Sequence, residues 1–188
     1  MGSYRKALES YDFALAIDER FASAWYNRGN SCANLGWIGE AIECFLKTIE
    51  LEPEDVHAWH NLGNAYDEIE RFEEALQAFD RALAISPANY ESLYGRGSTY
   101  EALKNYPAAL RDYTAALVYA PDVLEIWYAR ADVEFELGFS DAALVSLGQV
   151  LRLDPRNATA WVDFAEINLE AGKYDEAVMA AERAVALG

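Results

Sequence analysis

Apolar residues recur along the chain at i, i+3, i+4 and i+7, the spacing that places them on one face of an α-helix. Stretches with this spacing come in pairs, separated by a short polar break such as "EIERF" or "LKNYP". A proline follows the second stretch of most pairs and ends it, because proline lacks an amide hydrogen and restricts the residue before it. The pattern predicts an all-α protein built from pairs of amphipathic helices, with no strand.

The pairs repeat every 34 residues, and three residue types mark the period. The marking residues are the prolines Pro53, Pro87, Pro121 and Pro155, the alanines Ala7, Ala41, Ala75, Ala109, Ala143 and Ala177, and the tryptophans Trp25, Trp59, Trp127 and Trp161, with Leu93 in the remaining tryptophan place. We therefore predict a single array over 1–188. A lone second helix at 4–21 precedes repeats at 22–55, 56–89, 90–123, 124–157 and 158–188.

With these anchors, the sequence resembles the tetratricopeptide repeat (TPR) family, whose pattern is W-x2-L-G-x2-Y, then A-x3-F, then P. The second repeat matches every anchor, with Trp59, Leu62, Gly63, Tyr66, Ala75, Phe79 and Pro87. The other repeats depart from the pattern where Arg28, Arg96 and Arg130 replace the leucine and where Ala131 and Ala165 replace the glycine. The resemblance implies an α-solenoid, the TPR superhelix. Its concave groove is lined by the first helix of each pair and binds partner peptides.

The anchor residues are expected to pack rather than to bind ligands. Small residues let paired helices approach closely, and the tryptophans, which recur with the repeat, fill the space between them. Cys32 and Cys44 fall at inward places, where a thiol behaves as a small apolar group. Two cysteines without metal-type spacing favour a reducing compartment, and we expect a cytoplasmic protein.

Candidate binding residues lie at the groove-facing places of the first helices. The sixth place reads Asn27, Asn61, Gly95, Ala129 and Asp163, and the ninth reads Asn30, Asn64, Ser98, Asp132 and Glu166. The predicted groove thus changes from amides to acids along the array, and Asn34 prolongs the amide row. Because an amide both donates and accepts, paired asparagines are suited to hold the backbone of an extended peptide.

Charge sets the ligand class that we predict. The formal net charge of −17 argues against nucleic acid and anionic membrane surfaces as partners. Ten acids and no lysine or arginine occupy groove places, namely Asp67, Glu68, Glu91, Glu101, Glu125, Asp132, Glu136, Asp163, Glu166 and Glu170. A peptide containing Lys or Arg is therefore the preferred ligand, with Tyr26, Tyr94 and Tyr128 as stacking surfaces. The alternative is that these acids form a solvated face.

The family also has a clamp in which lysines and an arginine, beside asparagines, grip the carboxylate at the end of an acidic partner. Here Asn30 and Asn61 match the amides of that clamp. Tyr26, Glu91 and Gly95 stand where the cations would be. The resemblance therefore argues against an acidic chaperone tail as the ligand.

The two histidines, His57 and His60, fall on one face of a predicted first helix and point into the groove. They could share a metal ion, but only Glu91, from the next repeat, is placed to supply an oxygen ligand. We predict no metal site and interpret both as groove residues. Protonated histidines would oppose a basic peptide and weaken its binding at low pH.

No nucleophile and base arrangement, phosphate loop or cofactor motif is present, so we expect neither an enzyme nor a cofactor. We predict a protein-interaction scaffold that binds an extended, basic segment. Two alternatives are the recognition arm of a larger enzyme or assembly machine, and self-association through exposed terminal helices. The predicted groove residues are Tyr26, Asn27, Asn30, Asn34, His57, His60, Asn61, Asn64, Glu91, Tyr94, Ser98, Glu125, Tyr128, Asp132, Asp163 and Glu166.

Overall fold

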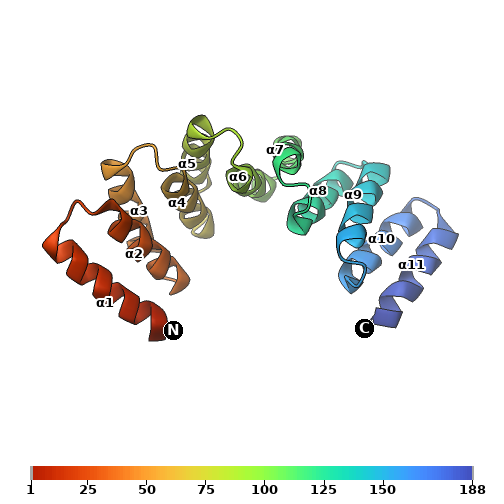
Figure 1. Cartoon of the computed structure of the whole chain (residues 1–188). Coiled ribbons are helices and arrows are strands. Elements are labelled where there is room, and N and C mark those ends of the chain that lie inside the picture. Colours follow the sequence, from red (N-terminus) through yellow and green to blue (C-terminus); the bar gives the residue numbers. More distant parts are fainter. Residues whose placement is uncertain (1, 188) are drawn as a thin grey trace. The chain divides into compact units, whose positions relative to one another are not determined.

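The computed structural model describes residues 2–187, and within that range it contains eleven helices and no strand (Figure 1). The prediction of an all-α protein is confirmed. The helices are α1 (Gly2–Ile17), α2 (Ala22–Asn34), α3 (Ile38–Leu51), α4 (Val56–Glu68), α5 (Phe72–Ile85), α6 (Tyr90–Ala102), α7 (Tyr106–Tyr119), α8 (Leu124–Glu136), α9 (Ser140–Leu153), α10 (Ala158–Glu170) and α11 (Tyr174–Leu187).

Helix lengths and connections alternate regularly after α1. The even-numbered helices have 13 residues and the odd-numbered ones 14. Three-residue connections within a pair alternate with four-residue connections between pairs. Extensive packing joins α2 to α3, α4 to α5, α8 to α9 and α10 to α11. This is the helix-pair packing of a TPR solenoid, as predicted.

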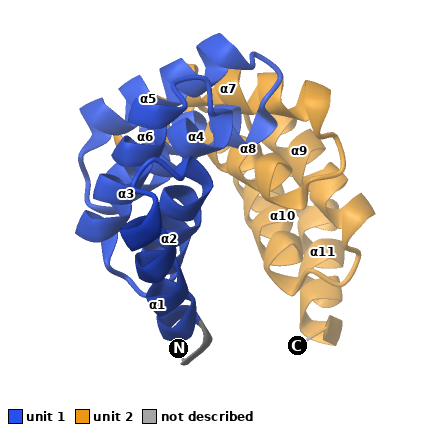
Figure 2. Ribbon diagram, turned by 60° about the vertical axis from the view of Figure 1, so that its left-hand side comes forward, with its two compact units in different colours: residues 1–99 blue, residues 100–188 orange. Residues whose placement is uncertain are grey.

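Two compact units divide the chain, Met1–Thr99 and Tyr100–Gly188 (Figure 2). Each has its own apolar core between the helices of its pairs. The core of the first unit includes Leu8, Cys32, Ile38, Ile42, Phe45 and Leu62, and that of the second includes Ala143, Leu147, Val150, Leu151, Ala160 and Ile167.

Four of the five tryptophans hold the loop that precedes their helix. The indole N–H of each donates to a backbone carbonyl six residues earlier: Trp25 to Glu19 (2.9 Å), Trp59 to Pro53 (2.9 Å), Trp127 to Pro121 (2.8 Å) and Trp161 to Pro155 (3.1 Å). The four tryptophans are half-buried, and the indole N–H of a largely buried ring usually finds such an acceptor. The repeated tryptophan therefore ties four of the five first helices to the preceding loop, a structural role that agrees with the interpretation of these residues as packing residues.

Two of the arginines that replace the family's leucine form ion pairs with the preceding second helix. Arg28 reaches Asp12 (2.8 Å), and Arg96 reaches Asp80 (2.6 Å). The partners are 16 residues apart in both cases. Arg28 also donates to the Sγ of the buried Cys44 (3.0 Å). In these two departures from the family pattern, an acid on one helix thus accompanies an arginine on the next.

The turn inside each helix pair requires a residue in the left-handed region. Gly36, Gly138 and Gly172 adopt φ of 76°, 77° and 72°, whereas Glu70 and Lys104 stand at the same repeat place with φ of 58° and 57°. A residue with a Cβ is strained there, and glycine is not.

We expect Glu70→Gly to raise the free energy of unfolding by about 0.5–1 kcal/mol, because relief of this strain exceeds the entropy cost of glycine. Urea unfolding of the variant would measure the gain. Gly36→Ala is the matched control and should lose about 1 kcal/mol. A loss of stability in Glu70→Gly would contradict the assigned turn.

Candidate functional site

Four asparagines of α2 and α4, which we call the amide cluster, lie together in the first unit. They are Asn30, Asn34, Asn61 and Asn64, and they line one pocket of about 220 Å³. Ala33, Phe45, Ala65 and Glu68 complete its wall. The prediction had placed these amides on one face, and the structure brings all four to one cavity.

Hydrogen bonds fix the orientation of the amide cluster. Asn61 Nδ2 donates to Asn30 Oδ1 (2.8 Å) and to the Tyr26 hydroxyl (3.2 Å), which joins α4 to α2. Asn34 Nδ2 donates to the backbone oxygen of Asn30 (2.7 Å). Within the described residues, the Asn30 Nδ2 group and the Asn61 Oδ1 atom keep no partner, so a donor and an acceptor remain for a peptide backbone.

His60 is a fixed, neutral part of this face. Asn64 Nδ2 lies 2.9 Å from His60 Nε2, and Ser92 Oγ lies 3.2 Å from Nδ1. Because the amide donates to Nε2, Nδ1 carries the proton and donates to Ser92. Burial lowers the pKa of His60, although Glu91 opposes the effect. Its ring also packs against Phe79, with 5.8 Å between centroids.

The remaining predicted residues of the first unit have more local surroundings. Asn27 Nδ2 donates to its own helix at Ser23 (2.8 Å). Glu91 accepts from Asn89 Nδ2 (2.9 Å) and is exposed. His57 is exposed, and Tyr94 and Ser98 are half-buried on α6. No group of three or more His, Cys, Asp or Glu with metal-binding geometry occurs among residues 2–187.

The second unit contains what we call the acid cluster, Glu101, Asp132 and Glu136. Partial burial of the carboxylate, together with the negative charges of Glu101 and Glu136, raises the pKa of Asp132 to about 6. Solvent still reaches the side chain, which is exposed at the surface. Glu101 accepts a hydrogen bond from the buried Tyr113 hydroxyl (2.6 Å). The cluster is therefore a concentrated negative charge on one surface.

A second acidic group lies on α10. The Tyr128 hydroxyl donates to Asp163, so two predicted residues from neighbouring first helices are in contact. Burial and the charge of Glu166 raise the pKa of Asp163. Glu125 and Glu166 are exposed.

None of the ten acids at predicted groove places forms an ion pair within the described part of the chain. The salt bridges there use Asp12, Glu50, Glu74, Asp80, Asp122, Glu134 and Asp141 instead. Ion pairing therefore neutralises other acids and leaves the ten at predicted groove places uncompensated. A cation from outside would meet no competing cation there.

Replacing Asp132 by asparagine should stabilise the protein near neutral pH. A carboxyl with a folded pKa above its usual value costs stability wherever it is ionised, so the cost is full above about pH 6 and vanishes below about pH 4. The shift alone would correspond to about 3 kcal/mol, but solvent access reduces the expected gain to about 1 kcal/mol, or about 3 °C in Tm.

Thermal unfolding of wild type and Asp132→Asn between about pH 4 and pH 8 measures this gain. Asp175→Asn, which removes an exposed acid of the same unit, is the control. An Asp132→Asn gain that is equal at both ends of the range would contradict the raised pKa.

Sequence reasoning missed the side chains that orient the site. Ser92, which binds His60, is 0% exposed. Thr99, also 0% exposed, donates to Asp67 (2.6 Å). The sequence did offer a signal, because Ser92 and Thr99 are polar at places where the preceding repeat has the apolar residues Ala58 and Ala65.

Comparison with known proteins agrees with the repeat architecture. Family models of the tetratricopeptide repeat match residues 22–55, 56–89, 94–144 and 128–188. Curated proteins gave no match. Among the described residues, no helix is long and apolar enough to cross a membrane.

Solved structures resemble the chain at low sequence identity. A crystal structure of MamA is 20% identical, with 85% of this chain and 93% of that chain covered and a TM-score of 0.80. A MamA structure from Desulfovibrio magneticus RS-1 is 19% identical, with coverages of 88% and 94% and a TM-score of 0.81. YrrB, described as a TPR protein with an unusual peptide-binding site, is 21% identical, with coverages of 96% and 93% and a TM-score of 0.80. These likenesses establish the fold.

Proposed function

Because the chain belongs to the tetratricopeptide repeat family, we propose that it is a non-catalytic scaffold whose first helices bind an extended, basic segment of another protein. Family membership supports the role of an interaction scaffold. The observation that carries the ligand class is the acid cluster, whose three carboxylates form no ion pair within residues 2–187, and where burial and the charges of Glu101 and Glu136 raise the pKa of Asp132 to about 6. A lysine or arginine of a partner relieves this repulsion and forms charge-assisted hydrogen bonds.

The amide cluster gives the first unit a proposed binding surface of its own. Asn61 is held by Asn30 and Tyr26, so its free amide oxygen is oriented before a ligand arrives. A pre-oriented amide loses little entropy on binding, and it recognises backbone rather than a particular side chain. The amide cluster would thus hold peptide backbone, and the acid cluster would select cations.

The proposed partner is a protein or peptide that contains Lys or Arg, and not a nucleic acid, since the net charge is −17. A reducing compartment such as the cytoplasm is the proposed location, supported by the two buried free cysteines. Burial raises the pKa of Cys32 to about 11, so its thiol stays neutral. A recognition arm of a larger enzyme or assembly machine, the alternative from the sequence, would use the same surface.

A display selection of random extended peptides against the whole chain tests the proposal. We expect enrichment of Lys- or Arg-containing segments that weakens at higher salt. The enriched peptides should bind Asp132→Lys about 30- to 100-fold more weakly, because a repulsive charge replaces an attractive one.

Glu43→Lys is the matched control, because it makes the same charge change at an exposed place on the second helix α3. It should bind within about 3-fold of wild type. No enrichment of basic segments, or equal loss in Asp132→Lys and Glu43→Lys, would mean that the acids only solvate the surface.

A further inference from the structure

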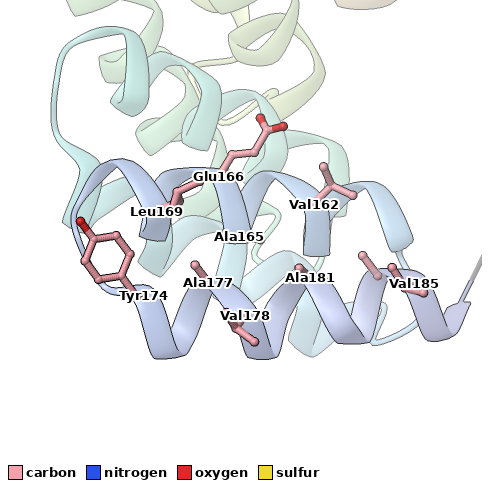
Figure 3. A pocket seen from close by; sticks show the side chains of 10 residues that line it. Val162, Ala165, Glu166, Leu169, Tyr174, Ala177, Val178, Ala181 and Val185 are labelled. Atoms are coloured by element: carbon pink, nitrogen blue, oxygen red, sulfur yellow. The ribbon is translucent and has the colours of Figure 1, made fainter.

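A pocket of about 420 Å³ lies between the last two helices, α10 and α11. Figure 3 shows Val162 and Leu169 of α10 and Val178 and Val185 of α11 around it, with the small Ala165, Ala177 and Ala181 between them. Apart from Glu166 and the Tyr174 hydroxyl, its lining is apolar.

The pocket exists because the last repeat lacks a large side chain that earlier repeats have. The place of Ala181 is occupied in the four preceding repeats by Phe45, Phe79, Tyr113 and Leu147, each no more than 1% exposed. In the first two of these repeats a glycine faces the ring across the pair, Gly29 against Phe45 and Gly63 against Phe79. In the last repeat both members of the pair, Ala165 and Ala181, are small, so the space between the helices is not filled.

The chain's own repeats show what such a surface binds. The α2–α3 pair is covered by α4, and α9 packs against α10 in the same way. The α10–α11 pair has no following helix within the described residues. Its Leu169, Val178 and Val185 consequently remain 57%, 59% and 81% exposed. An exposed apolar surface of this kind is built to receive a helix.

The other end of the chain carries an apolar helix face without an evident use. Phe13 and Ile17 of α1 are 71% and 75% exposed, and their i, i+4 spacing places them on one side of the helix. The place of Phe13 is held in the five repeats by Lys47, Arg81, Ala115, Gln149 and Arg183. An aromatic ring thus stands at a place where the other repeats have mostly polar residues, and this ring is exposed to solvent in the folded chain.

The two ends also differ in charge, since α1 carries two bases, Arg5 and Lys6, against two acids, Glu9 and Asp12, of which Asp12 pairs with Arg28. Arg5 and Lys6, both exposed on α1, are the only adjacent pair of basic residues in the chain. The α10 and α11 helices carry Arg183 as their single base against the acids Asp163, Glu166, Glu170, Asp175, Glu176 and Glu182.

We propose that the α10–α11 pocket binds the α1 helix of a second copy of this chain, with Phe13 filling the space that Ala181 leaves open. The contact joins different surfaces of the two copies. Each dimer therefore retains one free pocket and one free α1 helix, and association continues beyond two copies. This self-association does not depend on the proposed peptide binding, since it uses neither the amide cluster nor the acid cluster.

Analytical ultracentrifugation of the full chain from micromolar to millimolar concentration tests the proposal. The mean mass of the wild type is expected to rise with concentration. Two variants copy residues from the chain's other repeats. Ala181→Leu reproduces the Ala131 and Leu147 pair and fills the pocket, and Phe13→Lys reproduces Lys47. Each should weaken association about 30-fold, the value for one buried phenylalanine.

An equimolar mixture of the two variants provides the sharpest control. The Phe13→Lys copy keeps an open pocket, and the Ala181→Leu copy keeps Phe13. The mixture should therefore associate about as strongly as the wild type but stop at dimers, although each variant alone associates about 30-fold more weakly. Leu46→Lys, at a 43% exposed leucine of α3, should associate as the wild type does. A wild type that stays monomeric, single variants that associate as strongly as wild type, or a mixture that stays monomeric would overturn the proposal. Asp132→Lys should leave association unchanged, which separates this test from that of peptide binding.

Discussion

Phe79→Ala is expected to lower the free energy of unfolding by about 4 kcal/mol. Phe79 is 0% exposed, and its ring lies against two glycines, Gly63 of its own pair and Gly95 of the next first helix. A Cβ added at either glycine would come within 2.7 Å of the ring. Because glycines have no side chain to relax into the space, removal of the ring leaves a cavity.

Urea unfolding followed by circular dichroism measures this loss. Phe139→Ala is the control, since Phe139 is 53% exposed and its removal should cost no more than about 0.5 kcal/mol. A loss below about 1 kcal/mol for Phe79→Ala would show that the helices collapse around the space, against the packing described.

Arg130→Ala is expected to cost about 3 kcal/mol, because it leaves a buried carboxylate without its cation. Glu134 is 2% exposed, accepts from Arg130 Nε (2.8 Å) and is also bound by the Ser146 hydroxyl (2.6 Å). After the substitution, the Ser146 hydroxyl would be the remaining hydrogen-bond donor described for the Glu134 carboxylate. Removing both charges in Arg130→Met with Glu134→Leu should recover most of the loss, since no buried charge then remains.

Arg71→Ala is the control for the Arg130 measurement. Arg71 pairs with Glu74 at 2.6 Å, but both side chains are well exposed, and such pairs contribute no more than about 0.5 kcal/mol. Thermal unfolding of the single and double variants at neutral pH compares the two sites. Equal losses in Arg71→Ala and Arg130→Ala would contradict the burial of Glu134.

The fold could be predicted from the sequence because the same 34-residue pattern of apolar and polar residues occurs in several repeats. The first helices begin at Ala22, Val56, Tyr90, Leu124 and Ala158, the residues at which the predicted repeats begin. The left-handed turn residues were less visible. Glu70 and Lys104 occupy a place that favours glycine, and neither residue type signals such a conformation.

The candidate site was only partly predictable. The position of each residue within its repeat predicted which side chains share a face, and the four asparagines of the amide cluster line one pocket in the structure. Their hydrogen bonds could not be foreseen, because Asn61 reaches residues 31 and 35 positions earlier, and such contacts depend on how one pair packs on the next. For the same reason, the bond between His60 and Ser92 was invisible in the sequence.

The pH dependence of peptide affinity tests the central claim, that the acid cluster binds cations of a partner. We would measure the Kd of an enriched basic peptide by calorimetry at about pH 7.5 and about pH 5, for wild type and for Asp132→Asn. Asp132 loses its charge as the pH falls through about 6, so the wild type should bind about 10-fold more weakly at the lower pH. Asp132→Asn should bind weakly at both values, with a much smaller change. A wild-type affinity that is the same at both pH values would contradict the account.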